Sequence, residues 1–276
     1  MGRRAFGASV AVATAVALCF LLLPVVALFA HTSPANLLDQ LSNPVVKDAF
    51  VVSLKTTLVA QLLIVLFGTP TAYLLATERF RGRSLAITLV ELPLVLPPAV
   101  AGIGLLAAFG RMGLLGSTLD AFGIQLPFTQ TAVTIAVAYV ASPLYIRQAI
   151  AAFEATDPNL AAASRTLGAG PARTFFRVVL PLARGGLAAG LALSFARGLG
   201  EFGATIMFAG SLQKVTQTLP LAIYAEFDVN FDATLAMGCV LVLISVILLI
   251  ALRTGLTWQR SRSTASTSLF GLSRST

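Results

Sequence analysis

Long apolar runs constrain this chain more than any other feature. Six of them, at roughly 5–30, 50–76, 85–109, 128–153, 183–208 and 233–252, are long enough to cross a bilayer, since a hydrocarbon core of about 30 Å takes roughly 20 helical residues. With 57% apolar and 11% charged residues, the 276-residue chain is too apolar for a soluble domain. The sequence therefore predicts an all-α polytopic membrane protein with six transmembrane helices, the first of them a retained span rather than a signal peptide.

The basic residues predict the orientation of these spans. Thirteen Lys and Arg residues fall in connections on one side of the membrane and three on the other. Because short cytoplasmic loops carry the excess of basic residues, the richer side is predicted to be the cytoplasm, with both termini on it. The richer side holds Arg3, Arg4, Arg79, Arg81, Arg83, Arg165, Arg173, Arg177, Arg184, Arg253, Arg260, Arg262 and Arg274, and the other side holds Lys47, Arg111 and Lys214.

Several classes of function are disfavoured by the composition. The net charge of +8 lies in short clusters between apolar runs, without a basic stripe interleaved with aromatic residues, so we expect no nucleic-acid partner. None of the three lysines follows a glycine, as the lysine of a phosphate-binding loop does, so the chain is not expected to be an ATPase. With one histidine, His31, outside the first run and both cysteines inside apolar runs, we expect no catalytic site, no metal site and no bound cofactor.

The segment beginning at Asp157 is predicted to form a short helix on the cytoplasmic side. Asp157 is suited to cap the helix and Pro158 to occupy its first turn, and Gly168 is expected to end it. Between them, small or apolar residues recur at helical spacing and form one face. These residues are Leu160, Ala163, Ser164 and Leu167.

A second helix pattern follows in the same segment. It starts at Gly170-Pro171 and is expected to end at Leu180-Pro181, where the chain would turn back into the bilayer. Two interpretations of the helix pair stay open. It is either an interfacial element whose arginines face anionic lipid, or a docking site for a soluble partner, which the two-helix shape favours. No other internal segment offers a sizeable cytoplasmic surface for an ATP-hydrolysing partner.

The fifth apolar run carries a second unusual pattern. Small residues recur every four positions along it, and such ridges allow helices to approach closely in lipid. They do not account for Arg197 and Glu201, an i,i+4 pair predicted to share a third ridge with Thr205. Ionisable groups at depth are costly and usually face a partner or a wet cavity. A structural ion pair and a pore-lining role both remain open, and they are not exclusive.

The stretch AASRTLGAGPARTFFRVVLP resembles the EAA loop of ABC-importer permease subunits. Ala162, Ala163 and Ser164 stand at its Glu-Ala-Ala positions, Gly168 is its glycine and Leu180-Pro181 closes it; the Glu itself is missing. In that family the loop forms a coupling helix that sits in a cleft of the ATPase subunit. The resemblance implies that coupling to the ATPase depends on Asp157, Leu160, Ala162, Ala163, Ser164, Leu167, Gly168, Phe175, Phe176, Leu180 and Pro181.

Two further stretches indicate which branch of the ABC-importer permeases the chain resembles. GEFGATIMFAG, at 200–210, and TQTLPLAIY, at 216–224, resemble molybdate permease subunits of the type-I ABC importers more than the similar sulfate permeases. The likeness covers roughly residues 45 to 255. It implies the type-I importer permease fold, and it assigns a translocation or gate role to Arg197, Glu201, Phe202, Gly203 and Thr205.

The same resemblance implies partners and a location. It implies a homodimer in the cytoplasmic (inner) membrane, with two ATPase subunits that bind ATP and Mg²⁺ and an external molybdate-binding protein. The substrate rests on resemblance alone, so tungstate and sulfate or thiosulfate stay open, as does a secondary anion transporter. The expected domains are an N-terminal span with its external loop (1–49), the permease domain (50–253) with the coupling loop (157–181), and a cytoplasmic tail (254–276). The Ser/Thr-rich end of that tail, at 261–276, is expected to be disordered.

Overall fold

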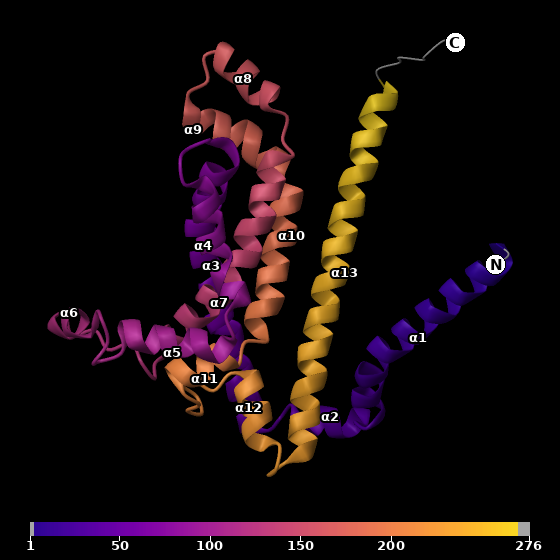
Figure 1. Ribbon diagram of the computed structural model, residues 1–276. Helices are drawn as coiled ribbons and strands as arrows, with labels where there is room; N and C mark the ends of the chain where they lie inside the picture. The colour runs from indigo at the N-terminus through magenta and orange to yellow at the C-terminus, as the bar shows by residue number, and fades with distance from the viewer. Residues whose placement is uncertain (1–2, 270–276) are drawn as a thin grey trace.

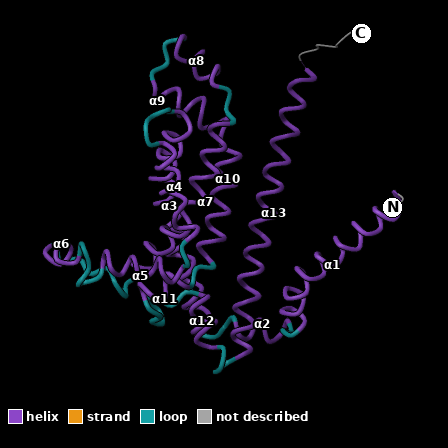
Figure 2. The backbone as a smooth tube through the Cα atoms, in the orientation of Figure 1, coloured by secondary structure: helices purple, strands orange, loops and turns teal. Residues whose placement is uncertain are grey.

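The computed structural model describes residues 3–269, and over that range the chain folds into helices and loops without a β-strand (Figures 1 and 2). The helical elements are α1 (Arg3–Ala30), α2 (Pro34–Gln40), α3 (Pro44–Thr77), α4 (Arg83–Val95), α5 (Pro98–Phe109), α6 (Gly116–Ala121), α7 (Gln130–Glu154), α8 (Pro158–Thr166), α9 (Pro171–Thr174), the π-helical η1 (Phe175–Val179), α10 (Leu180–Leu199), α11 (Gly203–Ala209), α12 (Leu219–Glu226) and α13 (Phe231–Leu269). The expected all-α membrane architecture is confirmed.

Among the described residues, five helices are long and apolar enough to cross a membrane, and a sixth span is present if α4 and α5 count as one. α7 is the centre of the bundle, since α3 and α10 pack along it. Its buried positions include many small side chains, such as Ala132, Ala136 and Ala141. They let neighbouring helices approach closely in lipid. A glycine of α3 has the same effect from the opposite side, since a Cβ at Gly68 would lie 3.0 Å from the ring of Tyr145 in α7.

The third apolar run is not the continuous span that the sequence predicts. α4 and α5 meet at an angle of 113° around Leu96-Pro97. Two prolines in succession, Pro97 and Pro98, remove two backbone N–H donors, and each proline also disfavours helical geometry at the residue before it. Leu96 accordingly adopts an extended conformation, with ψ of 133°. The run at 85–109 is therefore a bent pair of short helices.

The fifth run is interrupted as well. α10 ends at Leu199, and the chain re-enters a helix only at Gly203. Glycines at 198, 200 and 203 lower the helix propensity of this stretch. The side chain of Glu201 accepts a hydrogen bond from the N–H of Ala204, at 2.7 Å, which satisfies a donor at the start of α11. The expected run at 183–208 thus consists of a spanning helix and a separate short one.

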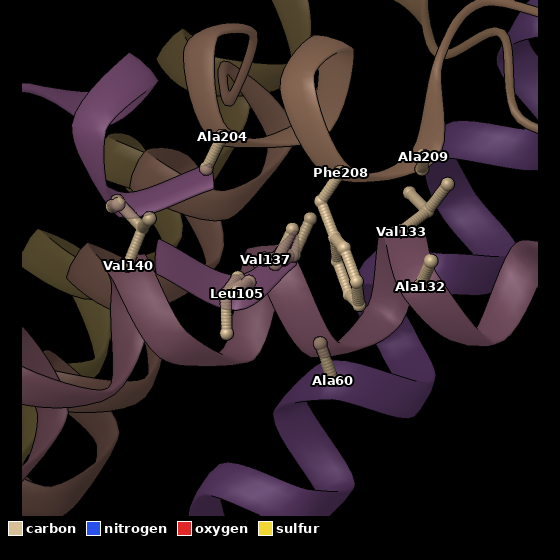
Figure 3. Packing of buried hydrophobic residues seen from close by; sticks show 11 residues of the cluster. Ala60, Leu105, Ala132, Val133, Val137, Val140, Ala204, Phe208 and Ala209 are labelled. Atoms are coloured by element: carbon tan, nitrogen blue, oxygen red, sulfur yellow. The ribbon is translucent and has the colours of Figure 1, made fainter. Parts of the chain in front are cut away.

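α5 and α11, the two short helices after these breaks, pack backbone to backbone. A Cβ at Gly102 would lie 2.6 Å from the carbonyl oxygen of Ala204, and one at Gly203 would lie 2.7 Å from Cβ of Pro98. No side chain fits at either glycine without a shift of the backbone. Phe208 of α11 then points into the core among residues of α3, α5 and α7 (Figure 3).

The two terminal helices lie at the edge of the bundle. α1 slopes away from the other helices (Figure 1), and near its C-terminal end Leu28 lies beside Gly238 of α13. α13 continues to Leu269, so residues 254–269 of the expected tail are helical, including residues 261–269 of the segment that was expected to be disordered. That stretch contains no proline, and no glycine after Gly255, to stop the helix. Residues 270–276 lie outside the described residues.

Candidate functional site

α8 stands at one end of the bundle, beyond the last turns of α3 and α7 and the first turn of α10 (Figure 1). Its first turn has the expected cap, because the carboxylate of Asp157 accepts a hydrogen bond from the N–H of Asn159 at 2.9 Å and Pro158 follows as the first helical residue. Its end also has the expected glycine. Gly168 adopts φ of +84°, and the N–H of Ala169 donates to the carbonyl of Ser164 at 3.1 Å, a pattern typical of helix C-termini.

The outer surface of α8 is apolar and uncovered. Leu160 is 47% exposed and Leu167 is 88% exposed, and Ala162 and Ala163 are also exposed. Ser164 lies on the inner side, where its hydroxyl is 3.2 Å from that of Thr174, a fully buried residue in α9. α8 is thus fixed to α9 from within, while its apolar side faces outward as a docking surface would.

The second helix of the segment differs from the prediction. The chain does not turn at Leu180-Pro181, because the helix that begins at Pro171 continues through η1 and α10 to Leu199. The helix widens to a π-turn there, and the N–H of Leu180 donates to the carbonyl of Phe175. Pro181 has no N–H for the carbonyl four residues before it, and a widened turn accommodates such a gap. Phe175 points into the protein, whereas Phe176 is 64% exposed.

The intramembrane pair of the fifth run is in contact. Nη1 of Arg197 lies 2.6 Å from Oε2 of Glu201, whose side chain is 1% exposed. Both carboxylate oxygens of Glu201 are engaged, because Oε1 accepts from the N–H of Ala204. Thr205 does not continue this ridge, contrary to the prediction. It lies in α11, past the break, and is fully buried.

The other two residues of the expected gate flank the same break. The Phe202 ring lies 5.4 Å from that of Tyr224, measured between centroids, and Gly203 packs on α5. The structure therefore brings Arg197, Glu201, Phe202, Gly203 and Thr205 to one junction between α10, α11 and α5.

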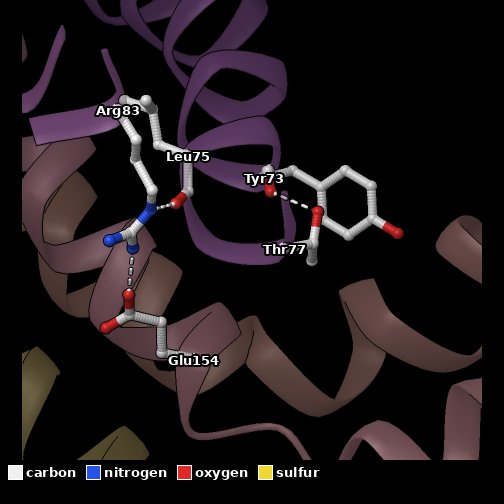
Figure 4. A network of polar contacts seen from close by, with 5 residues as sticks. All are labelled: Tyr73, Leu75, Thr77, Arg83 and Glu154. Atoms are coloured by element: carbon white, nitrogen blue, oxygen red, sulfur yellow. Dashed lines mark hydrogen bonds and ion pairs between the residues drawn. The ribbon is translucent and has the colours of Figure 1, made fainter. Parts of the chain in front are cut away.

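The sequence interpretation missed polar contacts between helices. Oε1 of Gln61 in α3, a buried residue, accepts a hydrogen bond from the hydroxyl of Ser194 in α10 at 2.8 Å. Nearer α8, Arg83 pairs with Glu154 at 2.6 Å (Figure 4). The sequence does contain one indication that Glu154 has a basic partner, since acidic residues are rare on the side of the membrane where the arginines are expected.

Known proteins resemble this chain over most of its length. The molybdenum transport system permease protein ModB of Mycobacterium tuberculosis is 39% identical over 231 residues, which is 84% of this chain and 88% of that protein. ModB of Escherichia coli K12 is 44% identical over 178 residues, covering 64% and 78%. The sulfate transport system permease protein CysT of E. coli K12 is 37% identical over 240 residues, covering 85% and 86%.

Solved structures and a family match agree on the architecture. A chain in the crystal structure of a bacterial ABC transporter involved in the import of the acidic polysaccharide alginate superposes with a TM-score of 0.61 at 17% identity, over 93% of this chain and 98% of that one. Residues 49–257 match the family described as binding-protein-dependent transport system inner membrane component. The chain, with its spanning bundle, belongs to this family of importer permeases.

Proposed function

We propose that this chain is the membrane-spanning subunit of an ATP-driven importer of molybdate, with ATP hydrolysis on a separate subunit. The observation that carries this proposal is the uncovered apolar surface of α8, with Leu160 and Leu167 facing outward at one end of a transmembrane bundle. A soluble protein exposing such a patch would be expected to bind a partner through it.

The arginines near the apolar surface of α8 support a cytoplasmic location for α8. Arg165, Arg173 and Arg177 are exposed at the same end of the bundle, and basic residues are enriched in cytoplasmic loops. We place both chain termini on that side, in the inner membrane. The two ATPases, with bound ATP and Mg²⁺, would then each receive one α8 from a homodimer of this chain.

The mechanism that fits these parts is alternating access. Closure of the two ATPases on ATP would draw the paired α8 helices together and open the pathway toward the external binding protein. The protein must supply a rigid element with two arrangements for such coupling to occur. The helix breaks at Leu96-Pro97 and Gly200–Phe202 divide the bundle into segments that could move against one another.

Molybdate is favoured over sulfate by the relatives. The two molybdenum permeases described above are 39% and 44% identical to this chain, against 37% for the sulfate permease. Both anions are tetrahedral dianions that differ mainly in size. Sulfate or thiosulfate and tungstate are accordingly the alternative substrates that an assay must include.

Reconstitution of the full complex tests the function. The chain is co-purified with its ATPase, inserted into proteoliposomes and supplied with the external binding protein and radiolabelled molybdate. We expect molybdate uptake that requires ATP, and ATP hydrolysis that the loaded binding protein stimulates. Preferential sulfate uptake would establish the alternative substrate, whereas uptake driven by an ion gradient without the ATPase would establish a secondary transporter.

Cysteine labelling tests the orientation. A cysteine replacing Arg173 should react with a membrane-impermeant thiol reagent only after the cytoplasmic face is exposed, whereas a cysteine replacing Lys214 should react in spheroplasts. Both positions are exposed in the protomer, so accessibility depends on the side of the membrane. Reversed labelling would place α8 outside the cell and rule out docking to an ATPase.

A further inference from the structure

We infer that Arg83 and Glu154 are positioning residues that link the α8 docking element to α3 and α4, so that a shift of α8 moves the transmembrane bundle. This inference rests on the proposed function, because it concerns how ATP hydrolysis on a partner would reach the pathway. Neither residue belongs to the docking surface. Glu154 is the last residue of α7, three positions before the cap of α8.

The contacts of Arg83 join three helix ends. Its Nη2 lies 2.6 Å from Oε1 of Glu154 at the end of α7, and its Nε donates to the carbonyl oxygen of Leu75 in the last turn of α3 at 2.6 Å (Figure 4). Arg83 itself is the first residue of α4. Because different nitrogens of the planar guanidinium serve the two partners, both contacts exist at once. One side chain therefore connects α3, α4 and α7.

Arg83 and Glu154 each lie at the helix end where the helix dipole disfavours their charge. A helix N-terminus favours negative groups and a C-terminus favours positive ones, yet Arg83 begins α4 and Glu154 ends α7. Each charge is compensated by the other, and Arg83 also satisfies the Leu75 carbonyl, which has no partner within α3. The stability of α4 and α7 themselves therefore does not explain this placement, whereas a link between the ends of α3, α4 and α7 does.

A cavity lies between α8 and the turn that joins α3 to α4. About 650 Å³ of open space separates α8 from the turn between α3 and α4. It is bounded by Ala162 and Arg165 of α8 on one side and by Glu78 and Arg79 of the turn on the other. A displacement of α8 therefore reaches α3 and α4 around the edge of this space, through the rings of η1, α7 and α3 or through the pair of Arg83 and Glu154. Arg83 and Glu154 lie on the cavity lining and connect the start of α4 with the end of α7, three residues before the cap of α8.

An aromatic cluster next to Arg83 and Glu154 holds η1, the helical turn that leads from α9 into α10, against α3 and α7 without the help of the ion pair. The rings of Tyr73 in α3 and Phe175 in η1 lie 4.8 Å apart, and that of Phe153 in α7 lies 5.5 Å from Tyr73. Phe153 is 3% exposed, whereas the side chain of its neighbour Glu154 is 49% exposed. Partly exposed ion pairs contribute little to stability. The aromatic cluster should therefore maintain the fold when the ion pair is removed.

The test measures how much transport each hydrolysed ATP drives. Arg83→Ala and Glu154→Gln complexes, with ATPase and binding protein, are reconstituted, and molybdate uptake is divided by ATP hydrolysed. Since coupling free energies between sites commonly correspond to factors of roughly 5 to 150, we expect this ratio to fall at least about fivefold while the yield of assembled complex stays near wild type. Arg83→Lys keeps the charge but not the two-pronged geometry, so its ratio should be intermediate.

Arg79→Ala is the matched control, since Arg79 lines the same cavity from the same turn and its replacement should leave the ratio unchanged. Wild-type ratios in Arg83→Ala and Glu154→Gln would overturn the inference. Loss of the assembled complex in all three variants of the pair would also overturn it, because the pair would then be a folding element. If the wild-type complex itself imports no molybdate, the proposed function fails whatever the variants do.

Discussion

Removing the cation of the buried pair should cost far more stability than neutralising its carboxylate. In Arg197→Met, the carboxylate of Glu201 stays 99% buried and keeps only the N–H of Ala204. Loss of one partner from a buried ion pair costs about 3–5 kcal/mol. In Glu201→Gln, the amide oxygen can still accept from Ala204, and the Arg197 side chain, 31% exposed, is not enclosed by the protein as the carboxylate is. We expect that variant to lose only about 1 kcal/mol.

Thermal unfolding of the purified chain measures this asymmetry. The exposed Cys19 is first replaced by serine, so that a thiol-reactive dye reports the exposure of Cys239, which is buried against α1. A midpoint shift of about 2–4 °C per kcal/mol is typical of chains of this size. Arg197→Met should therefore lower the midpoint by about 10 °C and Glu201→Gln by a few degrees.

The double variant separates a structural pair from a pore-lining cation. Because both charges leave together, Arg197→Met with Glu201→Gln should be less destabilised than the sum of the two single variants. Equal costs for the two single variants, or strict additivity, would refute the reasoning. A loss of transport in Arg197→Met at unchanged stability, not restored by the second substitution, would assign Arg197 to the pathway.

Two further predictions concern glycines, each with a glycine two residues away as the matched control. Gly168→Val should reduce ATPase co-purification, because valine adopts φ of +84° poorly; Gly170→Val, at an ordinary φ of −66° and with open space around it, should not, and equal yields would contradict the assignment of α8. Gly102→Ala should lower the unfolding midpoint, because its Cβ would lie 2.6 Å from a backbone oxygen of Ala204. Gly104→Ala, with nothing within 4 Å, should be neutral, and equal midpoints would contradict the close packing of α5 on α11.

Features that depend on neighbours in sequence were predictable. Asp157 caps α8 and Gly168 ends it, as expected, because both effects act within one helical turn. The contact between Arg197 and Glu201 also follows from i,i+4 spacing. The prediction failed at Leu180-Pro181 because it assumed that a proline ends a helix, whereas a π-turn let the helix continue.

Features that join distant parts of the chain were not predictable in the same way. Arg83 and Glu154 are 71 residues apart, and Gln61 and Ser194 are 133 apart. Periodicity places each of these residues on a helix, but it does not say which helices become neighbours. That choice depends on the summed packing of many small side chains along α7, which no single motif encodes.

By itself, the sequence determined that the chain resides in a membrane, where its apolar runs lie, and how α8 begins and ends, because hydropathy and capping are local properties. Only the tertiary structure decided how the broken spans run. After Leu96-Pro97 and after Leu199 the backbone loses helical hydrogen bonds, and sequence alone allows a kink, a hinge or a full break at such points. Close packing of α5 on α11 at Gly102 and Gly203 selects the full break at both, since contacts between the two segments stabilise the bent path that neither segment specifies alone.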